Sequence, residues 1–197
     1  ALATSYPDTW TFAVDGLIGA SPETLITVNQ GAVAARVLAG TTARGADADE
    51  DVAAAKALGT SRKDIDEHRF AVTSVVDALA PLTRDLVAPG EPHLLELPNL
   101  WHLATDVSGR LSNGASALDL VTVLHPTAAV AGTPTDAALD VIRRLEPFDR
   151  GRYAGPVGWI DANGDGEWAI ALRCAQIGAE PQRDAARYSD TIPVIAH

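Results

Sequence analysis

The stretch "DANGDGEWAI", which begins at Asp161, carries oxygen-bearing side chains at the spacing of a calcium-binding loop. Asp161, Asn163 and Asp165 hold the first, third and fifth positions, and Gly166 holds the sixth, as an EF-hand requires. The twelfth position, where such a loop needs a bidentate glutamate, is Leu172. The flanking segments are rich in β-branched, aromatic and alternating apolar residues, so they predict strands instead of the two helices of an EF-hand. The Asn-Gly and Asp-Gly pairs therefore favour the turn of a β-hairpin over a calcium site.

Three further residues have side chains suited to acid–base or anion chemistry. Glu23 follows a Gly-Ala-Ser-Pro bend at the start of a predicted strand, where acid–base groups are often displayed. Glu67 lies on the flank of a predicted helix, which is compatible with a cleft wall or a solvated surface. Arg173 stands inside "AIALRCAQI", and an arginine within an apolar strand needs an anion, either a carboxylate partner or a ligand.

The histidines and the cysteine give little support for a metal centre. The five histidines have no H-x-x-x-H spacing and no C-x-x-C pair accompanies them, which makes a zinc site improbable. His68 falls on an apolar helix face, so we expect a hydrogen-bonded core residue. His102, beside Trp101 in a strand pattern, is equally compatible with lining a cleft and with packing. Cys174 is expected to be a buried structural thiol.

Composition limits the classes of function. The net charge is −11, from 26 acidic and 15 basic residues, which argues against a nucleic-acid-binding protein. An uninterrupted apolar run of the ~18 residues needed to span a bilayer is absent from the sequence, so no membrane partner is expected. A single cysteine fits a reducing cytoplasm. We expect a globular cytoplasmic chain in which any anionic substrate meets a local cation or a metal ion.

The pattern of elements predicts an α+β fold with antiparallel sheets and packed helices, in a single domain over 1–197. Residues 9–38 are predicted to form a β-meander. A helix is expected from Asp47, and a second from Ser61 to about Ala80, opened by an S-x-x-D capping box. Its buried face should contain Ile65, His68, Val72, Val75, Val76 and Leu79.

The later elements alternate between strands and short helices. "HLLEL" and "LWHLATDV" predict strands, and "ASALDLVTVL" predicts a short helix. Another helix should run from an N-cap at Thr133 to about Leu145. The hairpin around Asp161 follows, then a polar loop over 178–190 and a strand-like end without a partner.

Several segments, in this order, resemble the chorismate-utilising enzymes, the family that includes isochorismate synthase, salicylate synthase, anthranilate synthase and aminodeoxychorismate synthase. The matching segments are "DGLIGASPETL", "LAGTTARG", "SRKDIDEH", "LPNLWHLATDVSGRL", "LHPTAAVAGTP", "LEPFDRGRYAGPVGW" and "GDGEWAIALRCAQI". Within the family, "LWHLAT" and "LEPFDR" are similar to the isochorismate synthase branch. The resemblance covers only the later half of such an enzyme, so it implies a partial family fold.

The resemblance implies a magnesium-dependent conversion of chorismate to isochorismate, in which water adds at ring carbon 2 as the hydroxyl leaves carbon 4. It implies that Glu23 is the general acid, that Glu67 is a magnesium ligand and that Arg173 contacts the side-chain carboxylate of the substrate. The same resemblance implies a substrate cavity whose lining comprises Gly40, Thr41, His102, Ala129 and Tyr153.

The sequence departs from the family pattern in ways that bear on activity. Ala128 stands where a proline is usual. The family's catalytic lysine has no counterpart, and its Gly-Ala-Gly loop with a second magnesium ligand would follow "TIPVIA". We therefore expect little activity from this chain by itself, and self-association through exposed sheet edges. Salicylate synthase is the alternative within the family, and anthranilate synthase is less favoured. A non-catalytic fragment or binding module is the alternative from a different class.

Overall fold

The computed structural model describes residues 2–5, 7, 9–112, 114–177 and 194–196. Its helices are α1 (Leu2–Ser5), α2 (Ala48–Thr60), α3 (Arg62–Leu79), the 3-10 helix η1 (Ala80–Leu82), α4 (Ala117–Leu124), α5 (Ala128–Ala131) and α6 (Thr135–Leu145). Its strands are β1 (Trp10–Val14), β2 (Leu17–Ser21), β3 (Thr24–Asn29), β4 (Ala32–Ala43), β5 (Thr83–Val87), β6 (His93–Glu96), β7 (Leu100–Leu111), β8 (Pro156–Ile160), β9 (Gly166–Ile170), β10 (Cys174–Ile177) and β11 (Val194–Ala196). The predicted α+β class is confirmed.

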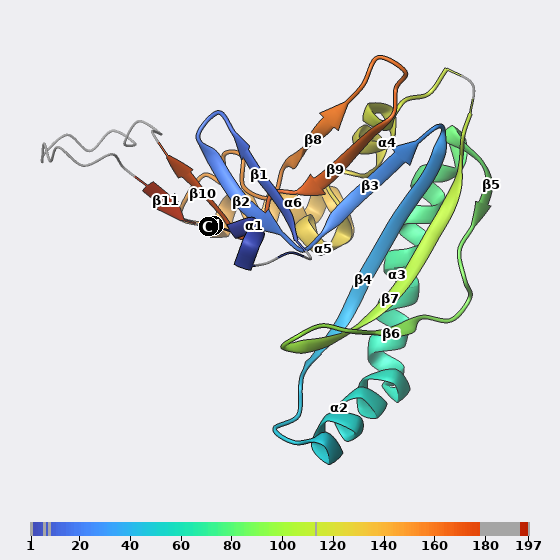
Figure 1. Ribbon diagram of the computed structural model, residues 1–197, viewed down its shortest axis with the longest axis vertical. Helices are drawn as coiled ribbons and strands as arrows, with labels where there is room; N and C mark the ends of the chain where they lie inside the picture. The colour runs from blue at the N-terminus through green and yellow to red at the C-terminus, as the bar shows by residue number, and fades with distance from the viewer. Residues whose placement is uncertain (1, 6, 8, 113, 178–193, 197) are drawn as a thin grey trace, which may run out of the picture.

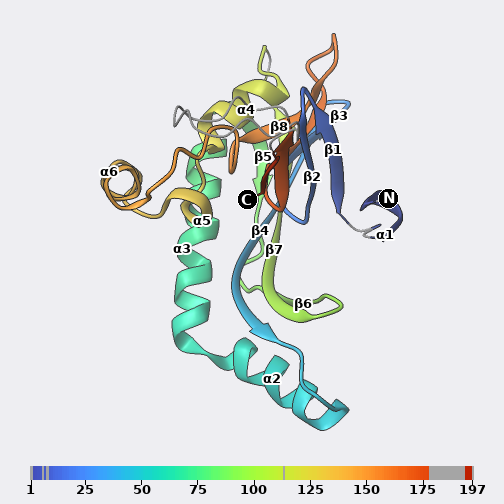
Figure 2. The same cartoon turned by 90° about the vertical axis from the view of Figure 1, so that its left-hand side faces the viewer.

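The described strands form two antiparallel sheets. A four-stranded sheet has the order β1-β2-β10-β11, and a seven-stranded sheet has the order β5-β7-β4-β3-β9-β8, with β6 paired to β7. The long strands β4 and β7 cross the seven-stranded sheet side by side, and α3 runs along one face of them (Figure 1, Figure 2). The four-stranded sheet lies near the N-terminal end of β3, on the side of the molecule away from α2 (Figure 1).

The first four strands are two hairpins in different sheets, so the prediction of one continuous meander over residues 9–38 was wrong. β1 pairs with β2 in the four-stranded sheet, whereas β3 pairs with β4 in the seven-stranded sheet. The bend at Pro22-Glu23 separates β2 from β3. Because Pro22 has no N–H to donate to a ladder hydrogen bond, the strand cannot continue regularly through it, and the chain passes to the other sheet at this point.

The segment "EWAIALRCAQI" is likewise divided between the sheets. β8 and β9 form the predicted hairpin, with Trp159 opposite Glu167. The chain then leaves the seven-stranded sheet, and β10 pairs with β2 in the other one. The terminal strand β11 pairs with β10, so the prediction that it lacks a partner was wrong. The predicted polar loop over 178–190 lies outside the described residues.

The carboxylates of the calcium-like stretch accept hydrogen bonds from backbone N–H groups. Asp161 Oδ1 accepts from the N–H of Asn163 at 2.8 Å and of Asp165 at 3.0 Å, within its own turn. Asp165 reaches the neighbouring β3–β4 turn, where Oδ2 accepts from Gln30 N at 2.6 Å and Oδ1 from Gly31 N at 3.0 Å. The predicted turn is confirmed, and Asp165 ties two hairpin turns together.

Replacing Asp165 by alanine should destabilise the fold by about 1–2 kcal/mol, because two charge-assisted hydrogen bonds to backbone N–H groups are lost. Urea unfolding measures this change, with Glu91→Ala on an exposed loop as the control.

Changing Asp161 and Asp165 to Asn should leave metal affinity in a calcium titration unchanged. A large loss of affinity would restore the calcium interpretation.

The two predicted helices after β4 form and are joined through Ser61. The side chain of Asp47 accepts from Asp49 N at 3.0 Å and Glu50 N at 2.9 Å, and so caps α2. Ser61 Oγ accepts from Asp64 N at 3.4 Å at the start of α3. The backbone N–H of Ser61 donates to the Leu58 carbonyl. The predicted capping box is therefore half formed, because Ser61 also ends the preceding helix.

The main core lies between the seven-stranded sheet and the helices α3 and α4. The apolar face predicted for α3 is directed inward: Leu79 is fully buried, and Val72, Val75 and Val76 pack against this core. Its central members include Ile26, Leu120 and Ile170, all with no exposed area. A second apolar cluster, which includes Phe12, Val157 and the buried Cys174, lies where the two sheets meet.

Three shorter elements differ from the sequence prediction. β5 was not anticipated and pairs with β7 in an irregular register. α6 begins one residue later than expected, because Pro134 has an extended ψ of 139° and itself occupies the N-cap position. α4 begins at Ala117 and not at Ala115, the first residue of the predicted segment, because Ser116 is the N-cap and makes a complete capping box with Asp119.

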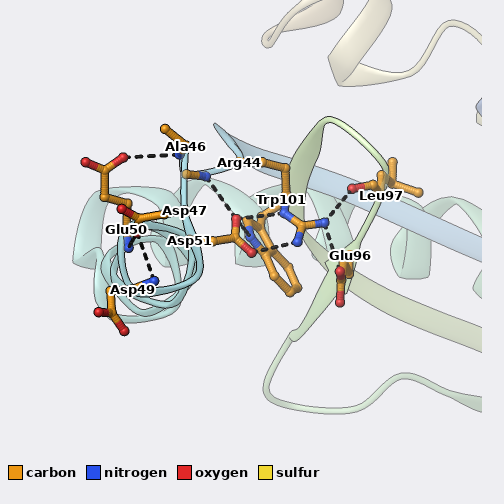
Figure 3. A network of polar contacts seen from close by, with 10 residues as sticks. Arg44, Ala46, Asp47, Asp49, Glu50, Asp51, Glu96, Leu97 and Trp101 are labelled. Atoms are coloured by element: carbon orange, nitrogen blue, oxygen red, sulfur yellow. Dashed lines mark hydrogen bonds and ion pairs between the residues drawn. The ribbon is translucent and has the colours of Figure 1, made fainter.

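An ion-pair network joins α2 to the distal ends of β4 and β7 (Figure 3). Arg44 binds Asp51 through Nε at 2.7 Å and through a second nitrogen at 2.6 Å. Trp101 Nε1 donates to Asp51 at 3.0 Å, and the Arg44 guanidinium lies 4.9 Å from the centre of the indole ring. The same guanidinium pairs with Glu96 at 2.8 Å. The hydrogen bonds from Arg44 hold the pKa of Asp51 well below its usual value.

The contribution of this network to the free energy of unfolding should decrease at acid pH. Because the folded-state pKa of Asp51 is lowered, its contribution is fully present above the unfolded pKa of about 3.9 and is lost as pH falls below it. We therefore expect Asp51→Asn to unfold at lower urea than the wild type at pH 7, with the difference shrinking by pH 3. Asp49→Asn is the control, since Asp49 joins the network only through its backbone N–H (Figure 3). A difference independent of pH would contradict the expectation.

In the described part of the chain, none of the helices has both the length and the apolar character that crossing a membrane requires. Among the described strands, β1 and β11 are the outer strands of the four-stranded sheet, and β5 and β8 are those of the seven-stranded sheet, where β6 also pairs with β7. Self-association through such edges stays a prediction.

Candidate functional site

The principal cleft lies between α3, the strands β3 and β4, and the segment from the end of α4 to α5. Its volume is about 640 Å³. Of the eight residues singled out in the sequence, Glu23, Glu67 and Ala129 line it. The lining is part apolar, from side chains such as Phe70 and Val123, and part polar. A cleft of this size can accommodate a small organic molecule.

Glu23 is positioned by the crossing from β2 to β3. Its backbone N–H donates to the buried Ser21 Oγ at 3.2 Å, and its carbonyl accepts from Ile170 N at 3.0 Å. Both contacts are made by main-chain atoms of Glu23, so they fix its backbone at the edge of the cleft. Burial raises the pKa of Glu23 above its usual value. A half-buried carboxyl group with a raised pKa keeps its proton to a higher pH and is therefore suited to act as a proton donor.

Glu67 lies on the cleft side of α3 and is more exposed than Glu23. Its carboxylate is 3.3 Å from Lys63 Nζ one turn earlier, an ion pair in which both side chains are largely solvated. Such a pair contributes little to stability and is easily exchanged for another cation. Ala129, in α5 on the opposite wall, contributes a small side chain and therefore leaves room in the cleft.

Gly40, Thr41 and His102 form a separate group at an irregular point of the β4–β7 ladder. The register shifts between the pairs Leu38–Ala104 and Thr41–His102, so β4 contains one extra residue. Thr41 Oγ1 lies 2.7 Å from His102 Nδ1, and the Gly40 carbonyl lies 3.4 Å from the same nitrogen. Burial lowers the pKa of His102, and the nearby positive charge of Arg173 lowers it further.

Arg173 and Tyr153 occupy positions that sequence reasoning did not foresee. Arg173 lies between β9 and β10 with φ of +47° and an exposed side chain. The prediction of an arginine within a continuous apolar strand, requiring a buried anion, was therefore wrong. Its charge still acts on His102, which places the two in electrostatic reach. Tyr153 precedes β8 and packs on the second apolar cluster.

Two cleft residues were missed by sequence reasoning. Arg36 lines the cleft beside Glu23 and pairs with Asp106 across the strands at 2.6 Å. In the alternating "AVAARVLA", Arg36 is opposite in phase to the buried Val33 and Val37, so the pattern predicts a side chain on the sheet face away from α3 and does not indicate the cleft. Thr127 also lines the cleft, and its buried hydroxyl has no hydrogen-bond partner among the described residues. The sequence contains no signal for the position of Thr127 in the cleft or for its unpaired hydroxyl.

The fit of a metal ion rests on the carboxylates of the cleft. Glu67 suits a hard cation such as magnesium, which is often held by one or two carboxylates and completes its shell with water and substrate oxygens. Within the described ranges, no three His, Cys, Asp or Glu side chains gather into a metal-binding group. The described residues thus fit one ligand of a magnesium ion and not a complete protein cage.

The fold is that of a known class of enzymes. The chain belongs to the family described as chorismate binding enzyme, whose model matches residues 1–184. It is similar to isochorismate synthases in particular. A protein named putative isochorismate synthase MenF, from Mycobacterium tuberculosis, is 46% identical over 165 residues, covering 83% of this chain and 44% of the relative. Isochorismate synthase DhbC from Bacillus subtilis is 45% identical over 161 residues, covering 81% of this chain and 40% of the relative.

Solved structures agree with these sequence relatives. The structure described as a putative 2,3-dihydroxybenzoate-specific isochorismate synthase, DhbC from Bacillus anthracis, matches with a TM-score of 0.77 and 42% identity, covering 85% of this chain and 46% of that one. Anthranilate synthase component I from Streptococcus pneumoniae matches with a TM-score of 0.76 and 29% identity, covering 88% and 39%. The chain spans less than half the length of these proteins.

Proposed function

We propose that the chain supplies the general acid of an isochorismate synthase active site, at which chorismate is isomerised to isochorismate. The observation that carries the proposal is the half-buried carboxyl of Glu23, with its raised pKa, in one cleft with Glu67 and Ala129. The similarity to relatives named isochorismate synthase supports the choice of reaction.

The reaction exchanges one water for another, since water adds at ring carbon 2 while the hydroxyl at carbon 4 departs. Hydroxide is a poor leaving group, so a proton must reach the departing oxygen as its bond to carbon breaks. Burial favours the protonated form of Glu23, which can supply that proton. A base must take a proton from the attacking water, and we assign no described residue to this role.

The substrate is a dicarboxylate, and it needs positive groups in a chain of net charge −11. Arg173 is proposed to contact the side-chain carboxylate, with Gly40, Thr41, His102 and Tyr153 as further neighbours. Glu67 is proposed as one ligand of a magnesium ion, which would neutralise the ring carboxylate when bound. The distribution of these residues over several groups fits a site that is completed by other parts of a longer protein.

The test compares the 197-residue chain with the natural full-length gene product in a coupled assay for isochorismate. We expect the full-length product to convert chorismate and the 197-residue chain to show little or no turnover. Normal turnover by the shorter chain would contradict this expectation, and no isochorismate from the full-length product would refute the proposed function. Salicylate and pyruvate as products would identify a salicylate synthase instead.

A further inference from the structure

The extra residue in β4 releases a backbone carbonyl from the sheet. Between the pairs Leu38–Ala104 and Thr41–His102, β4 has two residues, Ala39 and Gly40, where β7 has one, Leu103. Ala39 lies inside this bulge, where the regular ladder hydrogen bonds are interrupted. A carbonyl freed in this way, facing a packed helix, is costly unless another donor reaches it.

His68 of α3 provides that donor. It is 1% exposed, and its Nδ1 lies 2.9 Å from the Ala39 carbonyl oxygen. A carbonyl can only accept, so Nδ1 must carry the proton. The other ring nitrogen, Nε2, lies 2.8 Å from Thr105 Oγ1 on β7 and, in the neutral ring, accepts from that hydroxyl. Both nitrogens thus have partners, and the ring is held in one tautomer.

The bulge held by His68 connects two groups of candidate site residues. On the helix side, His68 is adjacent to Glu67, which lines the cleft. On the strand side, Ala39 precedes Gly40 and Thr41, and Thr41 contacts His102 at 2.7 Å. Gly40 has φ of +88°, and a Cβ there would lie 3.1 Å from Leu103 and 3.4 Å from Asp64 of α3. The helix and the bulge therefore also approach each other closely at Gly40, one residue beyond the carbonyl that His68 contacts.

We propose that His68 is a positioning residue, whose Nδ1–H bond to the Ala39 carbonyl sets the placement of Gly40, Thr41 and His102 relative to Glu67. His68 itself does not line the principal cleft. It acts through the bulge, and the residues that it positions are the proposed substrate and magnesium contacts. The inference thus rests on the proposed function for its catalytic consequence, whereas the tautomer and the bulge geometry are independent of it.

The structural part of the test uses the 197-residue chain and NMR. Nitrogen-15 spectra of the wild type should show His68 protonated at Nδ1, and a ring protonated only at Nε2 would overturn the proposal. His68→Asn places an amide nitrogen near the former Nδ1, whereas His68→Gln places its polar atoms near the former Nε2. We expect the amide signals of Gly40 and Thr41 to shift in the Gln variant and to stay near their wild-type positions in the Asn variant.

Thr105→Val is the matched control, because it removes the partner of Nε2 and keeps the bond to Ala39. It should leave the Gly40 and Thr41 signals at their wild-type positions, and a shift of these two signals away from the wild-type positions would overturn the proposal. This control remains informative if either His68 variant fails to fold.

The functional part uses the natural full-length gene product. His68→Gln should raise KM for chorismate about tenfold, the lower end of the loss seen when an orienting partner is removed, and His68→Asn should restore most of it. Equal KM values in the two variants would overturn the positioning role. If the wild-type product fails to convert chorismate, the proposed function fails, and the NMR results still decide the role of His68 in the bulge.

Discussion

Glu23→Gln in the natural full-length gene product is expected to lower kcat for isochorismate formation by about 10²–10⁴-fold, the usual contribution of a general acid. Glutamine has nearly the same shape and cannot supply the proton, so KM for chorismate should change little. A loss confined to kcat is the sign of an interaction made only in the transition state. Steady-state kinetics with an isochorismate-coupled assay measures both values.

The pH dependence gives an independent check on Glu23. The general acid must be protonated, so the rate should fall as pH rises through its pKa, and the raised pKa moves that fall toward neutral pH. Glu91→Gln, on an exposed loop away from the cleft, is the control and should keep the wild-type profile. Wild-type kcat in Glu23→Gln would remove the residue from the chemistry and leave the cleft without an acid.

Leu79→Ala should cost about 2–5 kcal/mol in the free energy of unfolding, because it opens a cavity in a core that relaxes only in part. Leu79 has no exposed area and is located at the end of α3, in the core shared with Ile26 and Leu120. Leu145→Ala makes the same chemical change at a side chain that is 75% exposed, and should cost less than about 0.5 kcal/mol. Urea unfolding of both variants measures the contrast, and similar costs would contradict the assignment of the core.

The sequence predicts the parts of this fold that depend on local chemistry. The 3.6-residue period identified the buried face of α3, and Asp47 identified the start of α2, because both signals arise from neighbours along the chain. The hairpin around Asp161 was equally local. Each of these elements is formed where it was expected.

The assignment of strands to sheets was not predictable in the same way. An alternating pattern shows that a segment is a strand and gives no information on its partner, so β2 and β3 were assigned to one sheet and β9 and β10 to one strand. The positive φ of Arg173, an unusual conformation for a residue with a side chain, is imposed by the change of sheet and has no local signature. The site was affected by the same limit: Glu23 and Glu67 were recognised through motifs, whereas the cleft positions of Arg36 and Thr127 and the hydrogen bonds of His68 depend on tertiary contacts.

The chain passes from one sheet to the other at two places described above, Pro22-Glu23 and the residues before Cys174, and each crossing contains a candidate site residue. The Glu23 carbonyl accepts from Ile170 at 3.0 Å, and the Arg173 carbonyl accepts from Ala20 at 3.3 Å, so each crossing is anchored to the other. The separation between the Glu23 carboxyl group and the Arg173 guanidinium is therefore a property of how the two sheets are joined. We expect an insertion at the Asp161 turn to leave that separation unchanged, whereas one added residue at either crossing would change the distance between Glu23 and Arg173 and hence the size of a molecule able to contact both.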